Sequence, residues 1–127
     1  MENAVKHGIP KDELRYDERP WGSWELLAMG PGYKVKRLIV KPGQRLSLQF
    51  HHHRSEHWVV VQGTATVIRD DERLVLRPDD STYIPRRGRH RIMNEGTEPL
   101  VIIEVQVGTC DEDDIVRLED DYGRADA

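Results

Sequence analysis

The sequence predicts an all-β barrel or sandwich of the jelly-roll kind. Seven segments of the chain are short and rich in Val, Ile, Leu, Thr and Tyr, and turn signals recur between them. One of these segments also shows a strict alternation of apolar and polar residues. The predicted strands are residues 33–41, 46–51, 57–68, 73–76, 82–84, 90–93 and 100–107.

The turn signals justify these strands in chain order. Pro31-Gly32 and Pro42-Gly43 precede the first two strands, because proline presets one backbone angle and glycine permits a left-handed one. The later signals are Gly63, Asp70-Asp71, Pro78 to Asp80, Gly88, Asn94 to Gly96 and Gly108. Strands this short, in a chain of 127 residues without repeats or Ser- or Gly-rich linkers, favour one small domain.

The alternation lies in residues 46–51. With a period of two, the apolar residues share one face and the polar residues share the other. The apolar face is Leu46, Leu48 and Phe50, and the polar face is Ser47, Gln49 and His51. A polar inner face indicates a barrel with a lined cavity; the alternative is that Gln49 and His51 face water.

Composition and charge exclude several classes of protein. Hydrophobic residues make up 37% of the chain, and its longest apolar runs fall well short of the roughly 20 residues of a membrane span. The net charge of −4 combines an acidic tail after Cys110 with a mildly basic body, which lacks the strong basic excess of a nucleic-acid footprint. Because Cys110 is the single cysteine, it excludes an intrachain disulfide and fits a reducing compartment. We therefore expect a cytoplasmic protein that binds neither membranes nor nucleic acid.

Histidines are concentrated in the segment from Gln49 to Trp58. It holds four of the six histidines of the chain together with one glutamate. Imidazole nitrogen and carboxylate oxygen are suitable ligands for a borderline divalent cation, and a later histidine could complete such a site. The alternative is a histidine-rich surface loop.

The spacing of these residues resembles the two motifs of the cupin family. The first motif is matched by Gly43, Gln49, His51, Glu56 and Gly63, with glutamine in place of the family's first histidine. The second motif is matched by Pro85, His90 and Asn94, with Gly88 one residue later than is usual. The resemblance implies that the downstream histidine is the last metal ligand.

Longer stretches resemble the type II mannose-6-phosphate isomerase domain, and they imply a cupin double-stranded β-helix. They are residues 19–25, 33–37, 42–67, 81–85, 90–94 and 112–124. We expect an N-terminal arm at 1–18, the barrel at 19–110, and an acidic C-terminal arm at 111–127 that is partly packed on the barrel. Such domains usually form the C-terminal part of bifunctional mannose-1-phosphate guanylyltransferase/isomerases. A chain of this length has no room for a nucleotide-binding domain, so we expect no guanylyl transfer.

The resemblance also implies a ligand set. In phosphomannose isomerases the metal is held by residues that correspond to Gln49, His51, Glu56 and His90. Glutamine ligates through a neutral oxygen, so Glu56 supplies the single formal negative charge and the cation stays a strong Lewis acid. We expect one divalent metal ion, with zinc as first choice and manganese, cobalt, nickel, iron or magnesium as alternatives.

Isomerisation of an aldose to a ketose moves a proton between C1 and C2 through a cis-enediol, which requires a proton carrier. His53 shares the face of Gln49 and His51 if that strand continues. Glu104 lies in an apolar strand, where burial raises a carboxyl pKa. These are the two catalytic candidates. The alternatives are that His53 only orients a ligand and that Glu104 pairs with a basic neighbour.

The phosphate group of such a substrate needs cationic donors, and arginine supplies them in a forked geometry. Arg54 lies inside the ligand segment, and Arg124 closes the family-like tail. We predict both as substrate-binding residues, with the C-terminal arm folding over the mouth of the barrel. The alternative is a solvated arm held by a few aliphatic residues.

These observations favour a metal-dependent mannose-6-phosphate isomerase that acts on a small sugar phosphate and forms a homodimer. Two other functions remain open. One is a non-catalytic, metal- and sugar-binding or regulatory cupin. The other is a different cupin enzyme, such as a dioxygenase, another sugar isomerase or an epimerase.

Overall fold

The computed structural model describes residues 5–6, 9–10 and 15–125. Within these residues the chain forms strands and no helix, which confirms the all-β prediction. Accordingly, no helix in the described part of the chain is long and apolar enough to span a membrane. The strands are β1 (Val5–Lys6), β2 (Ile9–Pro10), β3 (Tyr16–Arg19), β4 (Gly22–Gly30), β5 (Tyr33–Val40), β6 (Leu48–Phe50), β7 (Arg54–Gln62), β8 (Ala65–Arg69), β9 (Glu72–Leu76), β10 (Ser81–Ile84), β11 (His90–Met93), β12 (Leu100–Gly108) and β13 (Val116–Glu119).

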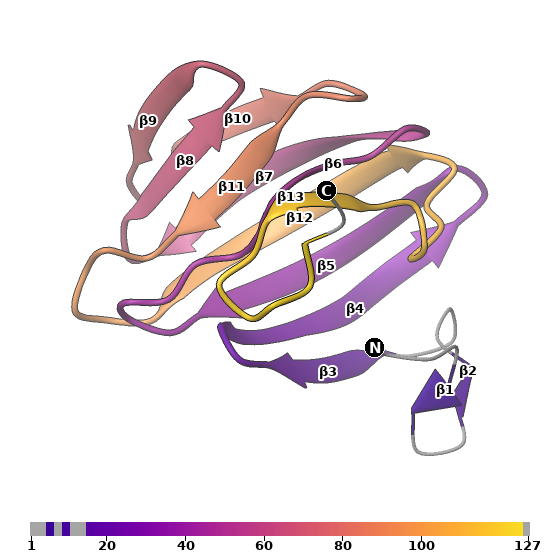
Figure 1. Cartoon of the computed structure of the whole chain (residues 1–127), viewed down its shortest axis with the longest axis horizontal. Coiled ribbons are helices and arrows are strands. Elements are labelled where there is room, and N and C mark those ends of the chain that lie inside the picture. The colour runs from indigo at the N-terminus through magenta and orange to yellow at the C-terminus, as the bar shows by residue number, and fades with distance from the viewer. Residues whose placement is uncertain (1–4, 7–8, 11–14, 126–127) are drawn as a thin grey trace.

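Two antiparallel sheets form the barrel (Figure 1). The six-stranded sheet has the order β10-β7-β12-β5-β4-β3, and the five-stranded sheet has the order β13-β6-β11-β8-β9. Strands β1 and β2 pair only with each other among the described strands. Residues of both large sheets line the same cavities, so the two sheets face each other across a shared interior.

Most predicted strands are present, and one predicted segment forms two strands. The segments predicted at 33–41, 73–76, 82–84, 90–93 and 100–107 correspond to β5, β9, β10, β11 and β12. The segment predicted at 57–68 is instead divided between β7 and β8 at Gly63. Gly63 has a φ of +82°, and a Cβ there would stand 2.8 Å from the backbone oxygen of Pro99. Glycine is therefore required where the chain reverses.

Strands β1 to β4 and β13 are absent from the sequence prediction. The middle of β4 is Glu-Leu-Leu-Ala-Met, which consists of good helix formers and lacks β-branched residues, so the pairing with β3 and β5 decides its conformation. Strand β13 lies in the acidic tail. The strand predicted at 46–51 shrinks to β6, and Leu46 lines the cavities together with Gln49. The predicted alternation therefore fails at Leu46.

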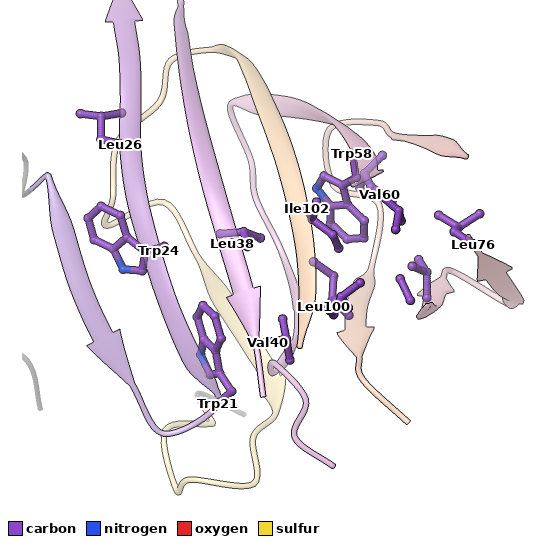
Figure 2. Packing of buried hydrophobic residues seen from close by; sticks show 14 residues of the cluster. Trp21, Trp24, Leu26, Leu38, Val40, Trp58, Val60, Leu76, Leu100 and Ile102 are labelled. Atoms are coloured by element: carbon purple, nitrogen blue, oxygen red, sulfur yellow. The ribbon is translucent and has the colours of Figure 1, made fainter. Parts of the chain in front are cut away.

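The inward faces of the central strands are apolar at one end of the barrel. Trp58 and Val60 on β7 and Leu100 and Ile102 on β12 alternate with residues that are more exposed. Figure 2 shows the apolar side chains as a continuous band from Leu26 on β4 to Leu76 on β9. This band is the hydrophobic core, and it supports the strands from which the polar residues project.

The same strands carry polar residues at the other end of their inward faces. Lys34 and Lys36 continue the buried positions of β5, and Glu104 and Gln106 continue those of β12. The register places Gln106 beside both Lys34 and Glu56. Buried polar groups are costly unless they are paired or used, so this polar end of the barrel is the place to look for a function.

The C-terminal segment packs on the barrel at this polar end. Strand β13 pairs with β6, and the Asp114 carboxylate accepts hydrogen bonds from the backbone N–H groups of His52 and His53. The Tyr122 hydroxyl donates to Gln44. At the other terminus, β3 spans the expected boundary between residues 18 and 19 and belongs to the six-stranded sheet.

Candidate metal centre and adjoining cavity

Three potential metal ligands meet at the polar end of the barrel. His51 follows β6, Glu56 lies on β7, and His90 begins β11. Their ligand atoms all lie within 4.8 Å of one another, and all three residues are buried. The His51 Nε2 atom is 3.3 Å from Glu56 Oε2, and the His90 Nε2 atom is 3.9 Å from Glu56 Oε1.

Both histidines present a lone pair to this centre. The Nδ1 atom of His51 lies 2.6 Å from the carbonyl oxygen of Asp114, and that of His90 lies 2.9 Å from the carbonyl oxygen of Gly88. Because a carbonyl oxygen can only accept, each Nδ1 carries the proton and each Nε2 keeps its lone pair. Burial lowers the pKa of His51 to about 4 and also lowers the pKa of His90. The rings are therefore neutral at neutral pH, which is the form that binds a metal.

The Glu56 carboxylate is ionised and held in place by two donors. Its Oε2 atom accepts from Arg54 Nε at 2.9 Å, and its Oε1 atom accepts from Trp58 Nε1 at 3.0 Å. Burial alone would raise the pKa of Glu56, but the positive charge of Arg54 and the smaller contributions of the other polar neighbours together outweigh it and hold the pKa well below its usual range. The centre thus contains one fixed negative charge.

Gln49 completes the predicted ligand set. Its Cα pairs with that of His90 across β6 and β11, and its side chain lines the same small cavity as His51, Glu56 and His90. The Gln49 amide nitrogen donates to Ser47 Oγ at 2.9 Å, so the carbonyl oxygen is the atom it offers as a ligand. Two imidazole nitrogens, one carboxylate and one amide oxygen fit a borderline divalent cation such as zinc.

Two adjoining cavities surround this centre. The smaller cavity, about 40 Å³, is the one formed around His51, Glu56 and His90. The larger cavity, about 120 Å³, extends toward β5 and the C-terminal segment. Both cavities are lined by Leu46, Gln49, Arg54 and Glu104. A ligand in the larger cavity would therefore lie next to the candidate metal centre.

Glu104 lies between the two cavities. Its neighbours across the sheet are Lys36 on β5 and Trp58 on β7. Burial, and then the negative charge of Glu56, raise the pKa of Glu104 to about 8. Lys36 opposes this shift, but its ammonium group lies 2.8 Å from a carboxylate oxygen of Glu112. The pKa of the Glu104 carboxyl group, which lies beside the candidate metal centre, is therefore close to neutral pH.

The two predicted substrate-binding arginines both line the larger cavity. The guanidinium of Arg54 contacts Glu56 Oε2 and also lies 3.2 Å from His51 Nε2. The guanidinium of Arg124 pairs with Asp120 at 2.9 Å and remains partly exposed. The C-terminal segment therefore brings Arg124 to the cavity, where strand order alone would not place it.

The structure does not bring His53 to the centre. Strand β6 ends at Phe50, so the alternation that would have placed His53 beside Gln49 and His51 is interrupted. The His53 side chain is exposed and lines neither of these two cavities. Its backbone N–H donates to Asp114 instead.

Lys36, Gln106 and Glu112 are among the residues of the larger cavity that sequence reasoning missed. A signal was available for two of them. Lys36 alternates with apolar residues in β5, and Gln106 follows Glu104 by two positions in β12, so each shares the inward face of its strand. Glu112 could not be found in this way, because it comes from the folded-back tail and no strand pattern places it.

Glu112 fastens this tail to the barrel. Its carboxylate lies 2.9 Å from Lys34 Nζ and 2.8 Å from Lys36 Nζ. Burial alone would raise the pKa of Glu112, but the two ammonium groups outweigh it and lower the pKa to about 2. Because the pKa of Glu112 is lower in the folded protein than its ordinary value, the carboxylate stabilises the folded state when the pH is above that ordinary value. This stabilisation is lost as the pH falls toward 2.

We expect Glu112→Gln to lower the free energy of unfolding at pH 7 by about 2 kcal/mol. The deficit should shrink as the pH is lowered from 5 toward 2, because the wild-type carboxylate then becomes protonated as well. Urea unfolding across this pH range measures it. Glu25→Gln is the control, since Glu25 pairs with Arg37 at the surface and should change stability by about 0.5 kcal/mol or less. A deficit of equal size at every pH would contradict the charge-pair explanation.

Comparison with known proteins agrees with this picture. The family described as "Mannose-6-phosphate isomerase C-terminal" matches residues 11–120. The xanthan biosynthesis protein XanB of Xanthomonas campestris pv. campestris (strain B100) is 58% identical over 107 residues, which are 84% of this chain and 23% of that protein. The mannose-1-phosphate guanylyltransferase ManC of Salmonella typhimurium (strain LT2) is 51% identical over 107 residues, which are 84% of this chain and 22% of that protein. The chain thus spans less than a quarter of the length of these relatives.

Solved structures show the same fold. A double-stranded β-helix protein from Klebsiella pneumoniae superposes with a TM-score of 0.66 at 22% identity, covering 75% of this chain and 77% of that one. This likeness confirms the predicted cupin-type barrel, while the family match covers nearly all of the described barrel. The chain therefore belongs to the mannose-6-phosphate isomerase C-terminal family.

Proposed function

We propose that this chain is a metal-dependent isomerase that interconverts mannose 6-phosphate and fructose 6-phosphate. The observation that carries the proposal is the convergence of His51, Glu56 and His90 within 4.8 Å, next to a cavity whose wall includes several cationic side chains. Family membership supports the same class of reaction. A sugar phosphate needs both features, because one end reacts and the other end carries negative charge.

Gln49, His51, Glu56 and His90 are the residues that would hold the cation. When bound, a divalent cation polarises the carbonyl and hydroxyl oxygens at C1 and C2 of the sugar. The protein orients these ligands through the carbonyl groups of Asp114 and Gly88, which fix both imidazole rings.

We propose Glu104 as the group that carries the proton between C1 and C2. Its carboxyl group lines both cavities and is buried, so it can reach a sugar that extends from one to the other. Gln106 Nε2 donates to Glu104 Oε1 at 2.8 Å and fixes the orientation of the carboxyl group. This arrangement supports Glu104 as the general acid–base group of the reaction.

The cationic groups of the larger cavity would bind the sugar phosphate. Arg124 lines the cavity from the C-terminal segment and would bind the phosphate, whereas Arg54 on β7 is held on Glu56 beside the candidate metal centre and would contact the oxygens at the reacting end of the sugar. Arginine offers several N–H donors in a planar fork, which matches the oxygens of a phosphate group. The sugar would then lie with its phosphate toward the C-terminal segment and its reacting carbons toward Glu56.

The proposal is tested by a coupled assay for fructose 6-phosphate formed from mannose 6-phosphate. Chelator-treated protein is reloaded separately with zinc, cobalt, manganese or magnesium. We expect turnover that requires a metal and that ranks the four metals. No turnover with any metal, in protein that binds metal tightly, would overturn the proposal for this chain and favour a sugar-binding role.

We expect Arg124→Lys to raise KM for mannose 6-phosphate by about tenfold and to leave kcat nearly unchanged. Lysine keeps the charge that pairs with Asp120, but it lacks the guanidinium N–H donors that remain beyond this pair and that would bind the phosphate. Steady-state kinetics measures the effect. Arg73→Lys is the control, because Arg73 is exposed and pairs with Glu95. An unchanged KM would show that Arg124 only anchors the C-terminal segment.

A further inference from the structure

Gln106 has a buried polar atom whose purpose the fold does not explain. The residue is 1% exposed and lies on the inward face of β12, next to Glu56 in the register of β7. Its Nε2 group donates to Glu104, which assigns the carbonyl oxygen to the opposite side of the amide. That oxygen, Oε1, is shielded from solvent and has no hydrogen-bond partner among the residues that the structure describes.

An unsatisfied buried carbonyl is unusual and costly. Nearly all buried polar groups in folded proteins have a partner, and leaving one without costs about 1–3 kcal/mol. An apolar side chain of the same size would avoid this cost at Gln106. Because Gln106 lines the larger cavity, a group bound in that cavity is the donor available to its oxygen.

The chemistry of the cavity wall indicates what kind of donor this is. Arg54, Lys36 and Arg124 offer only N–H donors there, and they suit the phosphate and other oxygens of a ligand. The Glu112 carboxylate accepts from Lys34 and Lys36. The Gln106 carbonyl is neutral and can only accept, so it suits a hydroxyl group, which a sugar supplies.

The position of Gln106 indicates which hydroxyl group this is. Gln106 lies beside the candidate ligand Glu56 in the sheet and holds the candidate proton carrier Glu104. The other neighbour of Gln106 in the sheet is Lys34, which pairs with Glu112, so Gln106 lies between the reacting end of the sugar and the C-terminal segment. The oxygens on C1 and C2 take part in the reaction, and the next hydroxyl along the chain of carbons is the one on C3.

We propose that the carbonyl oxygen of Gln106 accepts a hydrogen bond from the C3 hydroxyl of a hexose phosphate in the larger cavity, while its Nε2 group stays on Glu104. This inference rests on the proposed function, because it takes a sugar phosphate as the ligand. It makes Gln106 a substrate-binding residue that recognises the sugar and not its phosphate.

The test is a thermodynamic cycle in which the Gln106 amide and the C3 hydroxyl of the ligand are removed separately and together. The ligand is 1,5-anhydromannitol 6-phosphate, which cannot open to an aldehyde and does not react, together with its 3-deoxy and 4-deoxy derivatives. Calorimetric titration gives their affinities for wild-type protein and for Gln106→Met, both loaded with the same metal. Loss of the C3 hydroxyl should raise the Kd for both proteins, and the factor for wild type should be about five times the factor for Gln106→Met. Loss of the C4 hydroxyl should weaken both proteins by the same factor.

Two controls keep the result interpretable. Gln62→Met should discriminate between the ligands as wild type does, because Gln62 is exposed and donates to the backbone oxygen of Pro99. Gln106→Leu serves as a second variant, and thermal unfolding checks that each protein is folded. Equal factors for the 3-deoxy ligand in wild type and Gln106→Met would overturn the inference and leave Gln106 a purely structural role. Failure of the parent ligand to bind wild type would overturn the proposed function as well.

Discussion

Replacing His90 by alanine should abolish metal-dependent turnover and weaken zinc binding by at least about a hundredfold. His90 supplies one of the two imidazole nitrogens of the centre, and no other described histidine joins the group formed by His51, Glu56 and His90. Loss of a group that merely orients a metal ligand already costs about 10–100-fold in affinity, so loss of the ligand itself should cost more. Competition with a chromophoric chelator measures the affinity, and the coupled assay measures the turnover.

The matched control is His57→Ala. His57 is on β7 like Glu56, but its ring is exposed and lies against Tyr83, with ring centres 4.7 Å apart. This variant should bind zinc and turn over like the wild type. Unchanged zinc affinity in His90→Ala would show that the three residues do not form the metal site. If turnover were lost as well in that case, His90 would act on the reaction and not on the metal.

Replacing Glu104 by glutamine should lower kcat by about 10²–10⁴-fold while the metal affinity stays close to that of the wild type. Glutamine has nearly the shape of a protonated carboxyl group, so the pocket should stay folded and Gln106 should keep its hydrogen bond. The variant lacks a group that can give up and take back a proton. Single-turnover measurements separate this loss from changes in substrate binding.

The control for Glu104→Gln is Glu72→Gln on β9, since Glu72 is exposed and pairs with Arg69. It should leave kcat unchanged. Wild-type kcat in Glu104→Gln would exclude Glu104 as the proton carrier. His53 would then be the remaining sequence-predicted candidate, although its exposed position would require the segment after β6 to rearrange.

The short motifs named residues that lie together in the fold, because metal ligation constrains residue type and spacing together. The resemblance named Gln49, His51, Glu56 and His90, and the structure places all four around one small cavity. The catalytic candidates depended on strand boundaries, which sequence patterns predict poorly. Glu104 sits within a long regular strand, where alternation holds. The segment holding His53 leaves the sheet after Phe50, and the same argument fails there.

The sequence by itself determined the class of fold, the family and the chemistry of the candidate ligand set. These follow from local spacing: turn residues between short apolar segments, and ligand types at the intervals of a known motif. Only the tertiary structure decided the shape and charge of the cavity. Glu112 and Arg124 reach it because the tail folds back and pairs through β13, and the unpartnered carbonyl of Gln106 exists because of how β12 packs. Contacts between distant segments, together with burial, set these features, and no local pattern encodes either.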